Sequence, residues 1–255
     1  MIVCKSPSEI EKMRAANALV AGVLAELAAM VAPGVTTRDL DEVAERLVRE
    51  GGAEPAFKGY RGYPATLCAS VNEQVVHGIP SSRRLVDGDI LSLDMGVKLN
   101  GFFGDSAVTV PVGDITENAQ RLLTVTQEAL EHGIAQVRVG NRISDIGHAI
   151  QLHVESHGFS VVREFVGHGI GAALHEEPQI ANYGEPGRGP RMAEGMVLAI
   201  EPMVNMGRPA VKVLADGWTA VTRDGSLSAH FEHTVAVTRQ GPLILTVRTS
   251  PVAAS

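Results

Sequence analysis

Apolar residues recur every three or four positions in the first fifty residues, which is the spacing of amphipathic helices. The first helical stretch follows Ser6-Pro7-Ser8-Glu9, which has the pattern of a capping box with proline at the first helical position. Its apolar positions run to Val31, and Pro33-Gly34 ends it. A second stretch begins near Thr37 and stops at Gly51-Gly52. We therefore predict two consecutive helices at the start of the chain.

The spacing changes to that of strands from Ile90 onward. Two apolar runs, ILSLDMGVKL and FFGDSAVTV, flank Asn100-Gly101, and this dipeptide between strand-like runs is a strong hairpin signal. The second half repeats the order of helices and strands. It predicts helices over 116–137 and 144–157, then strands over 159–162 and 196–204 and a pair of strands around Asp224-Gly225 ending in AHFEHTVAVT.

The two halves also align residue by residue when shifted by 106 positions. The shift superimposes Val31, Gly34, Asp39, Leu40 and Gly52 on Val137, Gly140, Asp145, Ile146 and Gly158. We expect an α+β fold in which a helix-helix-strands unit occurs twice with pseudo-twofold symmetry, the helices covering one face of a joint antiparallel sheet. The halves, about 1–113 and 114–255, are expected to form one domain over 1–255 with the site on the open face.

Composition and charge narrow the class of protein. Of the 255 residues, 45% are hydrophobic and 20% charged, so the chain has the apolar content of a folded protein. Lysine and arginine (22) are fewer than aspartate and glutamate (29), and the net charge is −7. Such a chain has no overall positive field for nucleic acid or an anionic membrane, and we expect it to bind neither.

The cysteines and the apolar segments indicate a cytoplasmic protein. Cys4 and Cys68 are too few for a disulfide scaffold or a thiolate zinc site, so free thiols in a reducing compartment are expected. The N-terminal segment lacks the features of a secretory signal. The apolar stretch from Ala15 to Gly34 contains Asn17 and Glu26, which favours a buried amphipathic helix over a membrane span.

Three acidic residues lie inside apolar strand-like runs. Asp94 lies in ILSLDMGV, Glu201 in GMVLAIEPMV and Glu232 in SAHFEHTVAV. A buried carboxylate normally shifts its pKa, pairs with a cation or binds a metal. The nearest basic residues to Asp94 and Glu201 are Lys98 and Arg208, and both lie outside these apolar runs. The three acids therefore need a common counter-charge.

The predicted hairpin adds a fourth acid. If Asn100-Gly101 is a two-residue turn, Asp94 lies opposite Ala107 and Asp105 opposite Gly96. The two aspartates then share a face as diagonal neighbours about 7 to 8 Å apart, which is suitable for two ions about 3.5 to 4 Å apart. A one-residue slip would separate them, and the pair alone is equally consistent with a structural cap or turn.

Two histidines complete this set of candidate ligands. His168 lies in GHGIG, where the glycines permit close backbone approach, and His175 follows in LHEEP. Four carboxylates and a histidine without cysteine suit Mn, Fe, Co or Zn ions. The sequence has no HExxH, GxxxxGK[ST], GxSxG or paired CxxC motif, so zincin, phosphate-loop and serine-hydrolase chemistry lack support.

These residues, in this order, resemble the type I methionine aminopeptidases. The likeness extends over nearly the whole chain and includes YRGYPATLCASVNEQVVHGIP (60–80) as well as the ligand pattern. It implies the pita-bread fold and a metal-dependent aminopeptidase that removes the initiator methionine from nascent proteins with a small second residue. The five ligands it implies for two divalent ions (Co, Mn, Fe or Zn) are Asp94, Asp105, His168, Glu201 and Glu232.

The resemblance also implies individual roles. Asp94 would hold one ion and His168 and Glu201 the other, with Asp105 and Glu232 bridging both and a hydroxide between the ions as the nucleophile. His77 and His175 would hydrogen-bond the substrate and stabilise the tetrahedral intermediate, and Glu201 would also shuttle a proton. The methionine pocket would include Phe57, Tyr60, Tyr63, Cys68, Leu174 and Trp218, each of which alone is equally consistent with core packing.

Two positions depart from the family pattern, and two other readings remain. Phe103 and Arg61 stand where histidine is frequent, and both bear on metal preference and substrate entry. The short N-terminus and the absence of a long insertion favour the short bacterial form. A proline-directed peptidase of the same fold would be expected to carry another N-terminal domain, and a silent peptide-binding homologue to have lost ligands. We expect a monomer associated with ribosomes, although no motif indicates that association.

Overall fold

The first helix of the computed structural model, which describes residues 1–247, begins at the predicted capping box. The Ser6 hydroxyl accepts a hydrogen bond from the Glu9 backbone N–H, and the Glu9 carboxylate accepts one from Ser6 N–H. Thr36 and Asp39 form the same reciprocal pair. The helices are α1 (Pro7–Met30), α2 (Thr37–Glu50), α3 (Glu117–Ala135) and α4 (Ile143–Ser156), with a short 3₁₀ helix over Tyr60–Gly62.

The strands form two larger and two smaller antiparallel sheets. The first larger sheet contains β1 (Glu54–Pro55), β2 (Cys68–Val71), β4 (Ile90–Leu99) and β5 (Phe102–Pro111). The second contains β7 (Gly167–Gly169), β8 (Glu176–Ile180), β9 (Val197–Ile200), β14 (His233–Thr238) and β15 (Gly241–Ile244). The smaller sheets contain β6 (Ser160–Val161), β10 (Met203–Asn205) and β13 (Ser228–His230), and β3 (Gln74–Val76), β11 (Val211–Val213) and β12 (Ala220–Thr222).

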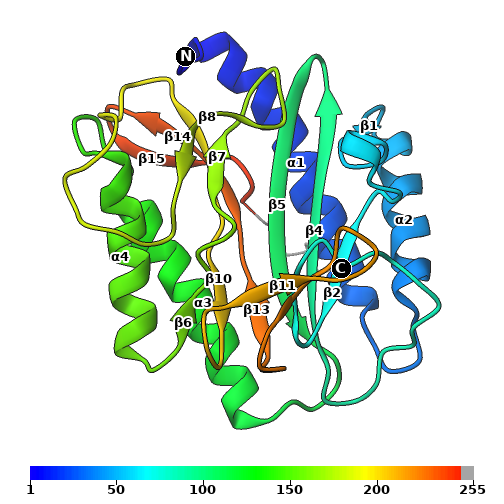
Figure 1. Ribbon diagram of the computed structural model, residues 1–255. Helices are drawn as coiled ribbons and strands as arrows, with labels where there is room; N and C mark the ends of the chain where they lie inside the picture. Colours follow the sequence, from blue (N-terminus) through cyan, green and yellow to red (C-terminus); the bar gives the residue numbers. More distant parts are fainter. Residues whose placement is uncertain (248–255) are drawn as a thin grey trace, which may run out of the picture.

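Hydrogen bonds between β5 and the start of β14 link the two larger sheets. The Glu232 backbone N–H donates to the Ala107 carbonyl at 3.0 Å, and the Ser106 hydroxyl donates to the Glu232 carbonyl at 2.7 Å. The Thr234 hydroxyl donates to the Asp105 carbonyl at 2.8 Å. Figure 1 shows α1 and α2 beside the first-half strands and α3 and α4 beside the second-half strands. The joint sheet is therefore two ladders linked at one place.

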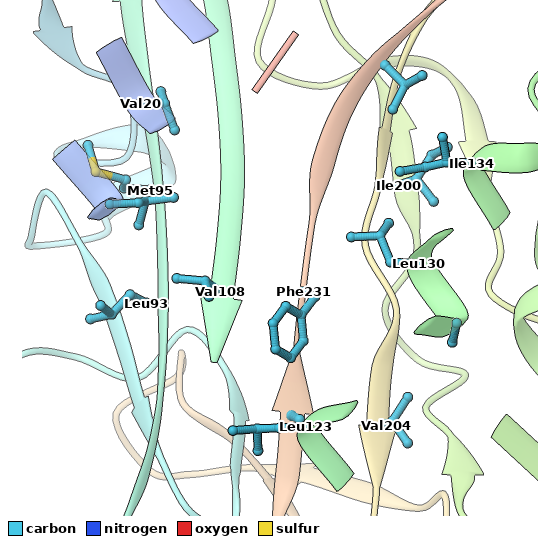
Figure 2. Close-up of a cluster of buried hydrophobic side chains, with 14 of the residues drawn as sticks. Val20, Leu93, Met95, Val108, Leu123, Leu130, Ile134, Ile200, Val204 and Phe231 are labelled. Carbon is cyan, nitrogen blue, oxygen red and sulfur yellow. The ribbon is translucent and has the colours of Figure 1, made fainter. Parts of the chain in front are cut away.

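The helices and strands share one extensive apolar core. Figure 2 shows part of it, with side chains from α1, β4 and β5 on one side and from α3, β9, β10 and Phe231 on the other. The labelled members, all buried, are Val20, Leu93, Met95, Val108, Leu123, Leu130, Ile134, Ile200, Val204 and Phe231. Burying such side chains stabilises the fold by roughly 1.5 to 3 kcal/mol each.

Helix α1 belongs to this core. It is long and apolar enough to cross a membrane by length and composition alone. It packs against β4 and β5, and Met13, Val20, Leu24 and Leu27 along it are fully buried within the protein. The predicted amphipathic core helix is therefore the structure that this segment adopts.

Two predictions about the second-half strands need correction. The strand predicted over 196–204 is interrupted at Glu201-Pro202 and forms β9 and β10 in different sheets, because proline has no N–H to continue a ladder. The strands around Asp224-Gly225 exist as β12 and β13, yet they do not pair with each other. The Asp224 carboxylate accepts hydrogen bonds from Arg208 N–H and Ser226 N–H, so it holds a loop between two sheets.

The repeated order of elements is visible in the chain positions. Each end of α4 lies 106 residues after the corresponding end of α2. Each half then contributes a long antiparallel strand pair, β4 with β5 and β9 with β14. The acidic residues predicted as ligands lie on or directly beside these two strand pairs.

Candidate metal centre and adjoining pocket

One pocket brings together all the residues predicted for the site. It is lined by Phe57, Tyr60, Arg61, Tyr63, Cys68, His77, Asp94, Asp105, His168, Leu174, His175, Glu201, Trp218 and Glu232. These residues come from both halves of the chain and include the predicted metal ligands, the two predicted substrate-binding histidines and the predicted methionine pocket. Arg61, which was not predicted as a site residue, also lines the pocket.

Asp94 and Asp105 have the geometry predicted from the Asn100-Gly101 turn. Asp94 lies opposite Ala107 and Gly96 opposite Asp105 in the β4–β5 ladder, so the predicted register is confirmed. Both aspartates therefore point to the same face. Asp94 is 9% exposed and Asp105 4% exposed, so two carboxylates are buried side by side in one hairpin.

His168 occupies the middle of the short central strand β7. Gly167 and Gly169 on either side lie against backbone carbonyls of Ala199 and Glu177, where a side chain would collide. The His168 Nδ1 lies 2.9 Å from the Gly169 carbonyl, which leaves Nε2 to face the acids. That nitrogen lies 3.6 Å from Glu201 Oε1 and 4.0 Å from Asp105 Oδ2.

Glu201 and Glu232 lie at the ends of the second-half strand pair. Glu201 follows β9, and Asn182 holds its backbone by donating to the Glu201 carbonyl at 3.0 Å. Glu232 precedes β14 and is fixed by the hydrogen bonds of its backbone to Ala107 and Ser106. The link between the two larger sheets therefore also positions Glu232 beside Asp105.

The carboxylates lack a positively charged partner. No lysine or arginine within residues 1–247 forms an ion pair with any of the four. Burial raises the pKa of Asp94 to about 7. Burial first and repulsion between the acids second raise the pKa values of Asp105, Glu201 and Glu232 well above the usual range. The protein alone therefore stabilises these groups in the protonated form.

A divalent cation fits this arrangement of donors. Asp105 Oδ1 and Glu232 Oε1 are buried, and neither has a hydrogen-bond partner among the described residues. Ligand atoms of Asp105, His168 and Glu232 all lie within 4.8 Å of one another. Burial and nearby His175 lower the pKa of His168 to about 4, so the ring is neutral at pH 7 and can donate its lone pair.

The raised pKa values predict an unusual pH dependence of stability without metal. In excess chelator, we expect the melting temperature to rise as pH falls from about 8.5 to about 6.5, because Asp94 and its neighbours take up protons when folded while unfolded carboxyls, with pKa values near 4, do not. Below about pH 6.5 the lowered pKa values of His77, His168 and His230 act in the opposite direction.

Thermal unfolding across this window measures the effect. Asp94→Asn should reduce the slope, whereas Glu11→Gln, at a side chain 65% exposed, should leave it unchanged. Added Mn²⁺ should flatten the dependence, because ions that bind the folded state compete with protons. If the melting temperature in chelator does not depend on pH, these acids are not buried without a cationic partner, and the prediction is wrong.

His77 and His175 lie beside the carboxylates. His77 follows β3 with a left-handed backbone (φ 60°), and its ring lies edge-on to Phe165 and Trp218 at 5.4 and 6.3 Å between centroids. His175 lies 4.2 Å from His168 between ring centroids. Burial lowers the pKa values of both, that of His77 to about 4. Neutral imidazoles therefore border the acids predicted as metal ligands.

The loop that carries His175 is held at two points. The Tyr60 hydroxyl lies 2.9 Å from His175 Nδ1, with the rings stacked at 5.3 Å. The neighbouring Glu176 forms an ion pair with Lys5 at 2.5 Å and accepts from Ala173 N–H at 3.1 Å. A neutral His175 that accepts from Tyr60 at Nδ1 carries its proton on Nε2, so it can donate a hydrogen bond.

Aromatic and sulfur-bearing side chains line the rest of the pocket. Tyr63 and Trp218 meet edge to face at 5.1 Å, and the Tyr63 hydroxyl lies 3.0 Å from the carbonyls of Leu67 and Gly78. Cys68 lies opposite Asp94 in the β2–β4 ladder, and burial raises the pKa of its thiol. Such walls suit a thioether side chain directly beside the acids.

The two departures from the family pattern have different positions. Arg61 lines the pocket with φ 50°, and its guanidinium lies 5.4 Å from the Tyr60 ring centroid. Phe103 does not line it; Lys98 lies over its ring at 5.7 Å, and its backbone N–H donates to Gly171. Of the two, Arg61 is the residue placed to touch an incoming substrate.

Sequence reasoning missed His230. It is 1% exposed, neither ring nitrogen has a hydrogen-bond partner among the described residues, and Nε2 lies 3.8 Å from Glu201 Oε2. Burial lowers its pKa to about 3. The signal was the spacing in AHFEHT, where a residue two positions before Glu232 on a strand points to the same face. His230 therefore backs Glu201 from within the core.

Comparisons with known proteins agree with this geometry. A sequence profile described as metallopeptidase family M24 matches residues 11–239. Methionine aminopeptidase 1 of Bacillus subtilis is 56% identical over 246 residues, which cover 96% of this chain and 99% of that protein. Methionine aminopeptidase of Clostridium perfringens is 54% identical over 247 residues, covering 97% and 99%.

Solved structures show the same likeness. A crystal structure of methionine aminopeptidase from Thermotoga maritima has a TM-score of 0.95 at 49% identity, covering 96% of this chain and 99% of that one. Prolidase from Pyrococcus furiosus has a TM-score of 0.80 at 23% identity, covering 97% of this chain and 66% of that one. At this identity the likeness to prolidase shows a shared fold only.

Proposed function

The chain belongs to metallopeptidase family M24, to its type I methionine aminopeptidases, and from this premise we propose how its pocket removes the initiator methionine from nascent proteins. The fold is the pita-bread fold of that family. The observation that carries the proposal is the convergence of four buried, uncompensated carboxylates and a neutral histidine beside an aromatic cleft.

Five residues would hold two divalent ions, of Co, Mn, Fe or Zn. Asp94 would hold one ion, His168 and Glu201 would hold the other, and Asp105 and Glu232 would serve both. The unpartnered oxygens of the two bridging acids and the proximity of Asp105, His168 and Glu232 support this assignment. When bound, such ions polarise a carbonyl and lower the pKa of a water nucleophile.

The surrounding side chains orient the substrate and move protons. His175 donates from Nε2 to the scissile amide, in the tautomer that Tyr60 selects. His77, neutral because of burial, lines the same pocket and makes a second contact with the substrate. Glu201, beside the buried His230, carries the proton from the attacking water to the leaving amine.

The aromatic end of the pocket receives the methionine side chain. Its walls are Phe57, Tyr60, Tyr63, Cys68, Leu174 and Trp218. The Tyr63–Trp218 edge-to-face contact and the two carbonyls at the Tyr63 hydroxyl hold the walls rigidly. A small second residue is selected because the next substrate position lies against the rim that carries His175 and Arg61.

The setting of the enzyme follows from the same proposal. It acts as a monomer of one catalytic domain in the cytoplasm, on N-termini leaving the ribosome. The unlinked Cys4 and Cys68 support a reducing compartment, and the net charge of −7 gives no support to binding nucleic acid on its own.

Peptide cleavage with and without metal tests the proposal. Chelator-stripped protein is incubated with a Met-Ala peptide, a Met-Leu peptide and an Ala-Pro peptide, with and without Mn²⁺ or Co²⁺, and products are identified by mass spectrometry. We expect methionine release from the Met-Ala peptide only, and only with metal. Cleavage of the Ala-Pro peptide would identify a proline-directed peptidase, and metal binding without any cleavage a silent homologue.

A further inference from the structure

Helices α3 and α4 carry a second set of potential metal ligands, distant in sequence from most of the first. Glu128 and His132 are four residues apart on α3, and His153 of α4 lies four residues before His157, the residue that caps the C-terminus of that helix. Residues at this spacing lie on one face of a helix, one turn apart. None of the four lines the pocket that holds the candidate catalytic ions.

The two helices approach closely enough to bring the pairs together. Gly133 on α3 lies against α4, where a Cβ atom would be 2.8 Å from Ile150 and 3.4 Å from Ile146. Residue 133 therefore meets residues 146 and 150, whereas residue 128 meets residue 153, so the helices are antiparallel. Figure 1 shows them side by side at the edge of the molecule.

The potential ligand atoms are within reach of a single ion. His153 Nε2 lies 3.0 Å from Glu128 Oε2, and ligand atoms of Glu128, His153 and His157 all lie within 4.8 Å of one another. The His153 ring centroid is 4.5 Å from those of His132 and His157. Two ligands about 2.0 to 2.2 Å from a tetrahedral ion are separated by roughly 3.4 Å.

The hydrogen bonds of the His157 ring leave one of its nitrogens free to bind an ion. His157 Nδ1 lies 2.8 Å from the His153 carbonyl and 3.3 Å from the Ser156 hydroxyl. A proton held on Nδ1 by a carbonyl leaves Nε2 as the ligating atom, which is the usual arrangement of metal-bound histidine. Burial first, and His132 and His157 as well, lower the pKa of His153 despite the opposing effect of Glu128.

Arg121, the positively charged residue near this cluster, has partners of its own. Arg121 donates to the His157 carbonyl, and its guanidinium lies 4.9 Å from the centroid of the Phe159 ring. Asp145 and His148 line the hollow that extends from His132 and His153 along the two helices. Glu128 is therefore the carboxylate that directly faces the histidines, with its side chain 47% exposed and that of His153 14% exposed.

We propose that Glu128, His153 and His157 form a second metal site, which binds a divalent transition ion such as Zn²⁺ and joins α3 to α4 away from the catalytic pocket, with the His132 ring stacked beside it. The two imidazoles and the carboxylate are nitrogen and oxygen ligands of the kinds that Zn²⁺ takes. The ion stabilises the folded chain according to its affinity, because unfolding separates the two helices.

Zinc binding to the full-length protein tests this site directly. Equilibrium dialysis against Zn²⁺ with metal quantification is compared between the wild type and His157→Ala, and between the wild type and Glu128→Gln. We expect each variant to bind this ion at least about 10-fold more weakly and to retain one ion fewer per chain at a free zinc concentration that just fills the wild-type sites. Both side chains are partly exposed, and circular dichroism verifies folding.

A matched variant and a site-specific signal separate this site from the catalytic one. His148→Ala removes another histidine of α4, which contacts the Gly184 carbonyl at 3.1 Å, and should leave zinc stoichiometry and affinity unchanged. In ¹H–¹⁵N spectra of histidine rings, the signals of His153 and His157 should shift together on adding one equivalent of zinc to this site. Equal loss in His148→Ala, or cluster signals that do not respond to zinc, would overturn the proposal. Neither result depends on peptide cleavage.

Discussion

Replacing Asp105 with alanine is expected to lower kcat/KM for a Met-Ala peptide by at least about 10³-fold, which corresponds to roughly 4 kcal/mol of transition-state stabilisation. Asp105 lies on β5 between Asp94 and His168, and one of its oxygens is buried without a hydrogen-bond partner among the described residues. The substitution therefore removes the carboxylate proposed to serve both ions. Bound metal per chain, measured on the same samples, should fall as well.

The same variant should not lose stability when metal is absent. Burial and the charges of Asp94 and Glu201 make Asp105 an unfavourable group in the folded protein without ions. Its removal relieves that repulsion, so the melting temperature in chelator should be unchanged or higher. Activity lost together with stability in chelator would instead mean that Asp105 supports the fold.

Asp41 provides the matched control for this prediction. It is also an aspartate whose pKa burial raises, and its carboxylate accepts hydrogen bonds from the backbone N–H groups of Thr66 and Leu67 at 2.9 Å. Asp41→Ala leaves two donors without their partner, so it should cost about 1 to 3 kcal/mol of stability and retain bound metal. Wild-type turnover in Asp105→Ala would contradict the metal assignment.

The parts of the site that lie within one hairpin were predictable from the sequence. The Asn100-Gly101 turn determines which residues face each other, and the alternation of side chains then places Asp94 and Asp105 on one face. The capping box at Ser6 similarly marked where α1 begins. These features depend on interactions between residues close in the chain.

The convergence of the second-half ligands on that hairpin depends on contacts between distant segments. Glu232 meets Ala107 across the link between the sheets, and no local pattern near either residue specifies this pairing. The interruption at Pro202 and the separate sheets of β12 and β13 have the same origin, because each strand segment joins the neighbour that the packed core offers. For the ligand role of Glu232 the family resemblance, rather than spacing, supplied the prediction, whereas the strand predictions at Pro202 and around Asp224-Gly225 were wrong.

His175→Ala is expected to lower kcat by about 10² to 10³-fold, with little change in bound metal, because it removes a hydrogen-bond donor and no proposed ligand. Its effect should fall on kcat more than on KM if the bond strengthens in the transition state. The donor role depends on Tyr60, whose hydroxyl lies 2.9 Å from Nδ1. Tyr60→Phe, which keeps the stacked ring, should therefore cost about 10-fold in kcat.

The comparison of these variants separates orientation from chemistry. If Tyr60 acts only by fixing the His175 tautomer, adding Tyr60→Phe to His175→Ala should cause no further loss in kcat, because the group it positions is absent. Steady-state kinetics on a Met-Ala peptide, with metal quantified in each sample, measures this coupling. Fully additive losses would mean that Tyr60 acts on the substrate independently of His175, through its place in the wall of the methionine pocket.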